Sequence, residues 1–108
     1  MSTAYGFATG LFGMPAGPGQ YLPRAYQLTI SPASVLKNTT AEQTFTVTGL
    51  QTGDAVFVNK PTNQAGLGIT NVRVTAADTI GISFINASAT AITPTASQTY
   101  MVVAIKAS

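Results

Sequence analysis

Short runs in which apolar and polar residues alternate recur from Tyr26 to the end of the chain. In the run from Thr44 to Thr48, Phe45 and Val47 fall on one side of an extended chain and three threonines fall on the other. Threonine, valine and isoleucine favour strands, and no apolar stripe with the 3.6-residue period of a helix is long enough to build one. The sequence therefore predicts an all-β body.

Turn-forming residues divide this body into six to eight short strands. Ser31-Pro32 ends the first strand, and Ala76-Ala77-Asp78 joins residues 69–75 to residues 79–85 as a hairpin. Strands of this number and length predict a small antiparallel β-sandwich, either a jelly roll or immunoglobulin-like. The predicted core consists of Leu28, Phe45, Val47, Val72, Val74, Ile82, Phe84 and Val102.

Residues 1–25 have a different composition from the body. They hold five of the ten glycines, three of the six prolines and no acidic residue, which disfavours a strand and predicts an extended N-terminal arm. Its apolar side chains are spaced as though they are to be buried, either on the chain's own body or, in the interpretation we favour, on a neighbouring subunit or a foreign partner. The predicted partner-binding residues of the arm are Tyr5, Phe7, Leu11, Phe12 and Tyr21. The chain therefore divides into an arm, residues 1–25, and a sandwich body, residues 26–108.

The residue types that carry most enzyme chemistry are scarce. The chain has no His and no Cys, so the usual catalytic base, thiol nucleophile and soft metal ligands are missing. Its complete set of acids is Glu42, Asp54 and Asp78, and each stands beside turn-forming residues, which predicts surface turns rather than a paired-carboxylate site. We expect no enzymatic activity, no cofactor and no metal.

Charge also limits the partners. The five cations, which give a net charge of +2, are scattered singly, so no basic stripe for nucleic acid is expected. Residues 1–13 contain no cation before an apolar stretch, and the longest apolar run, residues 100–105, is far shorter than the ~20 residues of a spanning helix. Neither an export signal nor a membrane segment is expected.

Assembly with other subunits is favoured instead. Charged residues make up only 7% of the chain, against about 25% in soluble domains, so few charges keep a lone monomer hydrated. Residues 55–58 and 100–105 are apolar on both sides of the predicted strands, which indicates an oligomer. The candidate interface residues are Phe57, Met101, Val103 and Ile105.

Several short motifs follow one another in a recognisable order between Thr44 and Ile105. They are the Phe-x-Val-x-Gly strand ending at Gly49, Gly53-Asp54 before Val56, the loop Ala65-Gly66-Leu67-Gly68, the strand containing Arg73, and Thr93-Pro94 before a closing Tyr100-x-Val102 strand. In this order and spacing the stretch resembles a recurrent family of small virion proteins of tailed bacteriophages. The arm is not part of this resemblance.

The resemblance implies a structural role. The expected function is that of a capsid cement or decoration protein, which binds the outside of an HK97-type head and stabilises contacts between capsomers. The expected partner is the major capsid protein of the same phage, and the expected location is the capsid exterior of the virion after synthesis in the bacterial host cytoplasm. A trimer is favoured over a dimer, because a trimer suits the local three-fold positions of an icosahedral shell.

Two other interpretations stay open. One is a tail or head-fibre component, since the resemblance points to the virion more strongly than to the head. The other is a carbohydrate-binding adhesive sandwich. A sugar binder needs exposed aromatic residues, yet the chain has no Trp, and Phe45, Phe57 and Phe84 stand in predicted strands where burial in the core is the simplest expectation.

Overall fold

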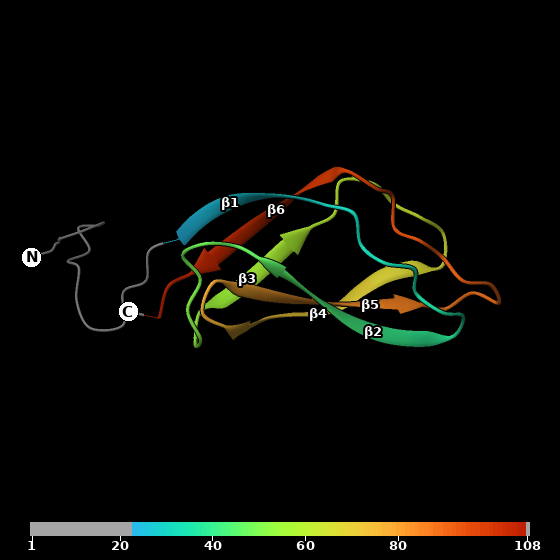
Figure 1. Ribbon diagram of the computed structural model, residues 1–108, viewed down its shortest axis with the longest axis horizontal. Helices are drawn as coiled ribbons and strands as arrows, with labels where there is room; N and C mark the ends of the chain where they lie inside the picture. Colours follow the sequence, from blue (N-terminus) through green and yellow to red (C-terminus); the bar gives the residue numbers. More distant parts are fainter. Residues whose placement is uncertain (1–22, 108) are drawn as a thin grey trace, which may run out of the picture.

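The structure is a computed structural model that describes residues 23–107 (Figure 1). Six strands and no helix occupy this range, which confirms the all-β prediction. The predicted arm residues Tyr5, Phe7, Leu11, Phe12 and Tyr21 lie outside the described residues. The strands are β1 (Pro23–Ile30), β2 (Thr39–Thr46), β3 (Ala55–Asn59), β4 (Leu67–Ala76), β5 (Thr79–Asn86) and β6 (Gln98–Ile105).

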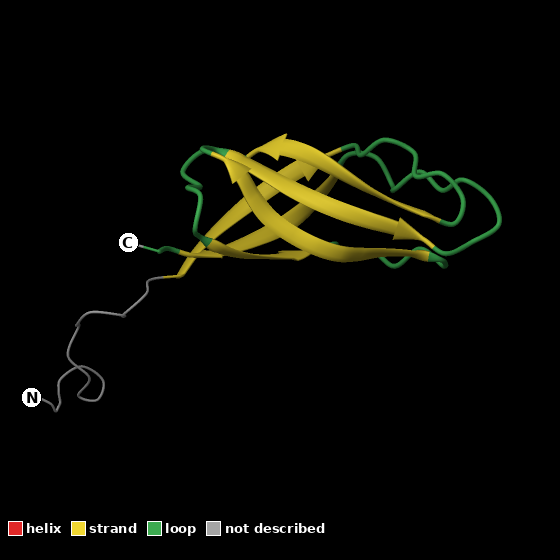
Figure 2. Cartoon of the chain, turned by 90° about the horizontal axis from the view of Figure 1, so that it is seen from below, coloured by secondary structure: helices red, strands yellow, loops and turns green. Residues whose placement is uncertain are grey.

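The strands form two three-stranded antiparallel sheets that pack face to face (Figures 1 and 2). In one sheet β6 lies between β1 and β3, and in the other β5 lies between β2 and β4. The predicted β-sandwich is therefore confirmed. The first two strands lie in different sheets, whereas an immunoglobulin domain begins with two strands of the same sheet. Of the two predicted alternatives, this strand order favours the jelly roll.

The first strand begins at Pro23, ahead of the predicted start of the body at Tyr26. Pro23 pairs with Ile105 and Ala25 with Val103. A proline can occupy this position because it is the first residue of an edge strand, where no ladder hydrogen bond from its nitrogen is needed. The strand ends at Ile30, directly before Ser31-Pro32, as predicted.

The predicted hairpin is also present. β4 and β5 pair in register with Val72 opposite Ile82 and Val74 opposite Ile80, and the chain turns at Ala77-Asp78. Asp78 has a φ of 59°, in the left-handed region that Asp tolerates better than most residues. Two register shifts interrupt β4, and bulges of this kind help to keep an edge strand from pairing with other chains.

The core lies between the two sheets. Of the predicted core residues, the buried ones are Leu28, Val47, Ile82, Phe84 and Val102. The remaining three, Phe45, Val72 and Val74, are half-buried and pack against this core, because they lie on the edge strands β2 and β4. The buried set also contains residues that were not in the predicted core. They are Val35 and Leu50 outside the strands, and Ile30, Val56, Ile80, Tyr100 and Ala104 within them.

Candidate interaction surface

The two sheets present unlike outer faces. The outer face of the β2-β5-β4 sheet is polar, and its centre is an ion pair in which the Arg73 guanidinium donates to both carboxylate oxygens of Glu42, at 2.8 and 2.9 Å. This hydrogen bond holds the pKa of Glu42 below its usual value. The pair spans β5 above Gly81, where a Cβ atom would come within 2.5 Å of Glu42 Oε2 and 2.8 Å of Thr75 Cγ2. Only a glycine leaves room for the pair.

The outer face of the β1-β6-β3 sheet is apolar where β1 begins and β6 ends. Strand pairing places Val103 between Ala25 and Phe57 in one row and Ile105 between Pro23 and Ala55 in the next. Met101 follows along β6. We call this set the apolar face: Pro23, Ala25, Ala55, Phe57, Met101, Val103 and Ile105.

The apolar face gives way to polar residues toward the other end of the sheet. There Met101 lies between Gln27 and Asn59, and the hydroxyl groups of Thr29 and Thr99 are hydrogen-bonded at 2.8 Å. The apolar residues are therefore gathered at the end of the sandwich where Pro23 connects to residues 1–22.

All four predicted interface residues, Phe57, Met101, Val103 and Ile105, lie on this one face. The alternative expectation that Phe57 belongs to the core is wrong: its side chain is 58% exposed, because β3 turns Val56 inward and Phe57 outward. Met101 is 38% and Val103 37% exposed. Taking about 180 Å² for a fully exposed side chain of this size, these three leave roughly 240 Å² in contact with water. A stable interface needs about 800 Å² per partner, so these three side chains alone do not supply one.

A groove of mixed polar and apolar lining adjoins the apolar face at the edge of the sandwich. It has a volume of about 400 Å³ and lies between the unpaired edges of β3 and β4, lined by residues 56–58 and 69–72. Phe57 belongs both to the apolar face and to this groove, so its ring lies where the two surfaces meet.

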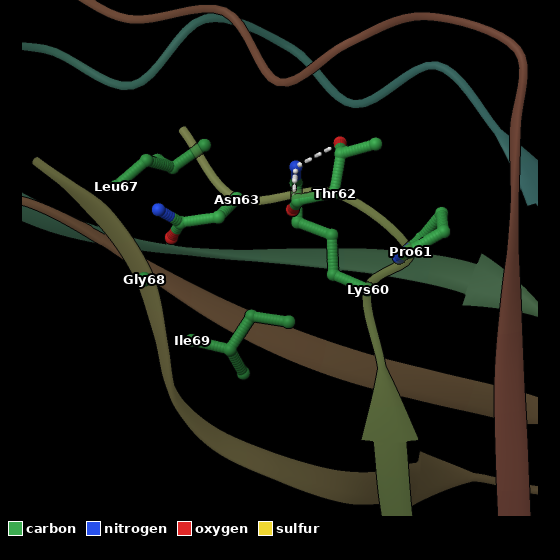
Figure 3. A pocket seen from close by; sticks show the side chains of 7 residues that line it. All are labelled: Lys60, Pro61, Thr62, Asn63, Leu67, Gly68 and Ile69. Carbon is green, nitrogen blue, oxygen red and sulfur yellow. Dashed lines mark hydrogen bonds between the residues drawn. The ribbon is translucent and has the colours of Figure 1, made fainter. Parts of the chain in front are cut away.

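A second hollow, of about 360 Å³, lies between the loop after β3 and the start of β4 (Figure 3). Lys60 Nζ donates to the carbonyl oxygen and the hydroxyl of Thr62, at 2.9 and 3.2 Å, and the Thr62 hydroxyl donates to Gln98 Oε1. Burial lowers the pKa of Lys60. Lys60 is the one charged side chain among the described residues that line this hollow, and its hydrogen bonds to Thr62 hold the loop in place.

The acidic residues do not all lie in surface turns as predicted. Asp54 is buried: its carboxylate accepts hydrogen bonds from Lys106 Nζ at 2.6 Å and from the backbone N–H groups of Gln51 and Ala107. The hydrogen bond from Lys106, followed by that from Gln51, lowers the pKa of Asp54. Glu42 lies within β2 rather than in a turn. Asp54 therefore fastens the end of β6 to the turn before β3, a role its sequence position did not reveal.

Asp78 fits the prediction of an exposed turn and also ties the hairpin to the loop after β2. Its side chain accepts a hydrogen bond from Gly49 N. Its backbone carbonyl accepts a hydrogen bond from Val47 N, and its backbone N–H donates to the carbonyl oxygen of Leu50. Among residues 23–107, no three His, Cys, Asp or Glu side chains lie close enough to hold a metal ion.

Asn86 is a buried polar residue that the sequence did not single out as structural. Its amide nitrogen donates to the carbonyl oxygens of Val35 and Thr90, and its oxygen accepts from the N–H and hydroxyl of Ser88. It is completely buried, so these four bonds organise the loop that leaves β5. Its amide nitrogen and oxygen therefore find their partners inside the fold.

Within the described range, no helix combines the length and the apolar character needed to cross a membrane. Comparison with models of protein families, with curated proteins and with solved structures finds no significant match to the chain. The contrast between one polar and one apolar outer face is therefore the main structural evidence that bears on function.

Proposed function

We propose that the protein is a structural virion component of a tailed bacteriophage, a capsid cement or decoration protein that binds the outside of an HK97-type head and bridges neighbouring capsomers. The observation that supports this proposal most directly is the contrast between the two sheets. One outer face carries an ion pair and threonines, and the other carries exposed Phe57, Met101 and Val103. A subunit held on a shell needs one face for contact and one for water.

The size of the apolar face determines how such a protein attaches. Roughly 240 Å² of large exposed side chains is well below the ~800 Å² per partner of a stable pairwise interface. Several weak contacts made at once raise the effective concentration and give firm attachment without one large interface. Groups of three copies at local three-fold positions of the shell provide this multivalency, and the arm residues Tyr5, Phe7, Leu11, Phe12 and Tyr21 add contacts to the major capsid protein or to a neighbouring copy.

The test is the position of the chain on particles of the phage that encodes it. Gold-labelled antibody against the chain should mark the head surface of intact particles, and cryo-electron microscopy should show its density in groups of three. Label confined to the tail would replace this proposal by a tail or fibre role. Particles that carry no copies of the chain would overturn the virion role altogether.

The face used for attachment can be tested with matched variants. Heads that lack the chain are incubated with wild-type protein or with a double variant, and occupancy is measured by gel densitometry. Phe57→Glu/Val103→Glu should reduce occupancy at least tenfold, because two charges would have to be buried in the contact. Thr40→Glu/Thr46→Glu, which adds the same charges to exposed positions of the polar face, should bind like wild type. Equal loss in both variants would contradict attachment through the apolar face.

A further inference from the structure

The apolar face is exposed at the point where the described part of the chain begins. Pro23 is itself a member of this face and is joined directly to residues 1–22. A protein with only 7% charged residues has little to keep such a surface from associating with other copies before assembly. The question is what covers the face in the free protein.

We propose that residues 1–22 of the free protein cover the apolar face of their own chain, with Phe12 and its apolar neighbours lying against Phe57 and Val103, until an assembly partner displaces them. The composition of the segment matches the face. It contains Phe7, Leu11, Phe12 and Met14 and has no Asp, Glu, Lys or Arg side chain. Covering an uncharged face with an uncharged segment buries no charged side chain, whereas covering the opposite sheet would bury the Glu42–Arg73 pair.

The length of the segment is sufficient for this contact. The stretch from Phe12 to Pro23 can span roughly 35 Å when extended, and an eight-residue strand such as β6 is about 26 Å long. Gly17-Pro18-Gly19 supplies the residue types that reverse a chain, with Pro followed by Gly as in a type II turn. With a turn there, residue 17 lies beside residue 20, and the five residues back to Phe12 bring it about two residues past Pro23. Phe12 can therefore reach the row that contains Ala25, Val103 and Phe57.

Covalent connection favours the chain's own segment over that of another copy. A segment tethered at the rim of the face is present at an effective concentration in the millimolar range, whereas another copy is present at its bulk concentration. At micromolar protein, the chain's own segment therefore occupies the face first. On a shell, where copies and capsid protein stand side by side, the local concentration of competitors rises and exchange becomes possible. This covering concerns the free protein and does not depend on which assembly it later joins.

The test uses the full chain, which has no cysteine, so that one introduced pair reports one contact. Gly13→Cys places a thiol beside Phe12, and Ala55→Cys places one at an exposed position of the apolar face. The control pair is Gly13→Cys/Thr46→Cys, with the second thiol on the polar face. Thr46 ends β2 at the same end of the sandwich, since Gly49, which follows it, accepts a hydrogen bond from Lys106 just after β6.

At low micromolar protein under mild oxidation, the Gly13→Cys/Ala55→Cys chain should form an intrachain disulfide at least tenfold faster than the control pair, at a rate independent of protein concentration. Adding Phe12→Ser should reduce the rate to that of the control. Equal rates for the two pairs would overturn the proposal, and so would interchain products whose yield rises with concentration. A second pair, Gly13→Cys/Gln27→Cys, repeats the measurement on the same face and applies if the first variant does not give the wild-type circular-dichroism spectrum.

This readout is separate from the location of the protein on particles. Preferential intrachain crosslinking together with unlabelled particles would support the covering while removing the virion role. Labelled heads together with equal crosslinking rates would do the reverse.

Discussion

The buried hydroxyl of Tyr100 leads to a prediction that removing a polar atom stabilises the fold. Tyr100 lies in the middle of β6, its side chain is completely buried, and its hydroxyl has no hydrogen-bond partner in the structure. A buried hydroxyl without a partner loses its bonds to water on folding and gains none in return, at a cost of about 1–3 kcal/mol. Tyr100→Phe removes that cost and keeps the ring.

The expected gain is smaller than the full desolvation cost, because the missing oxygen leaves a small void beside the ring. We expect Tyr100→Phe to raise the free energy of unfolding by about 1–2 kcal/mol. For a domain of this size, this corresponds to an increase in Tm of roughly 5–10 °C. Urea and thermal unfolding followed by circular dichroism, at one fixed protein concentration, measure both quantities.

Alkaline pH provides an independent readout of the same group. Burial raises the pKa of Tyr100 in the folded protein. The unfolded chain therefore ionises first, and wild-type stability falls as the pH rises above about 10, the ordinary tyrosine value. Tyr100→Phe should flatten this loss.

Tyr26→Phe, at a half-buried tyrosine of β1, serves as the control and should change stability by less than about 0.5 kcal/mol. A Tyr100→Phe protein no more stable than wild type would refute the reasoning. It would mean that the hydroxyl has a partner in solution, such as a buried water.

Three further substitutions test other parts of the structure by the same unfolding measurements. Phe84→Ala, at a completely buried core position, should lower the free energy of unfolding by about 3–5 kcal/mol, and an unchanged Tm would contradict the core assignment. Asp54→Asn should lower Tm at neutral pH. Because folding lowers the pKa of Asp54, the ionised carboxylate stabilises the folded protein fully above about pH 4, and this stabilisation disappears as the pH falls through the lowered pKa. The Tm values of the wild type and the variant should therefore converge in acid. Gly81→Ala should lower Tm by roughly 2–8 °C, because the added methyl group displaces Glu42. The decrease should be smaller when Glu42 is already replaced by Ala. A decrease of the same size in the Glu42→Ala protein would mean that the clash is with Thr75 instead.

Alternation of apolar and polar residues predicted much of the fold because the side-chain period of a strand depends only on local geometry. It correctly grouped Met101, Val103 and Ile105 on one side of β6, opposite Tyr100 and Val102. Alternation separates two faces without saying which one meets the core. Where both are apolar, as at Val56 and Phe57, only the packing of the second sheet decides, and it places the larger side chain outside.

What the sequence could not predict depends on residues far apart along the chain. Val35 and Leu50 are loop residues by every local measure, yet they are almost fully buried, because the loops that carry them close the ends of the sandwich. Asp54 follows a glycine in a turn, the usual setting of an exposed carboxylate. It is buried because Lys106, distant in sequence, reaches it after β6 has paired with β3. Such contacts arise from strand order, which alternation does not encode.

The same strand order explains why the apolar face lies at the end of the molecule where the described part of the chain begins. β6 runs antiparallel to both β1 and β3, so the end of β6 lies beside the starts of its two neighbours. Ile105 is therefore flanked by Pro23 and Ala55, and the uncharged segment before Pro23 is attached where the exposed face is most apolar. Had β1 run in the opposite direction, this segment would begin beside Thr99, at the polar end of the face. The position of Pro23 at the apolar end of the face, which makes covering possible, thus follows from the antiparallel arrangement of the strands alone.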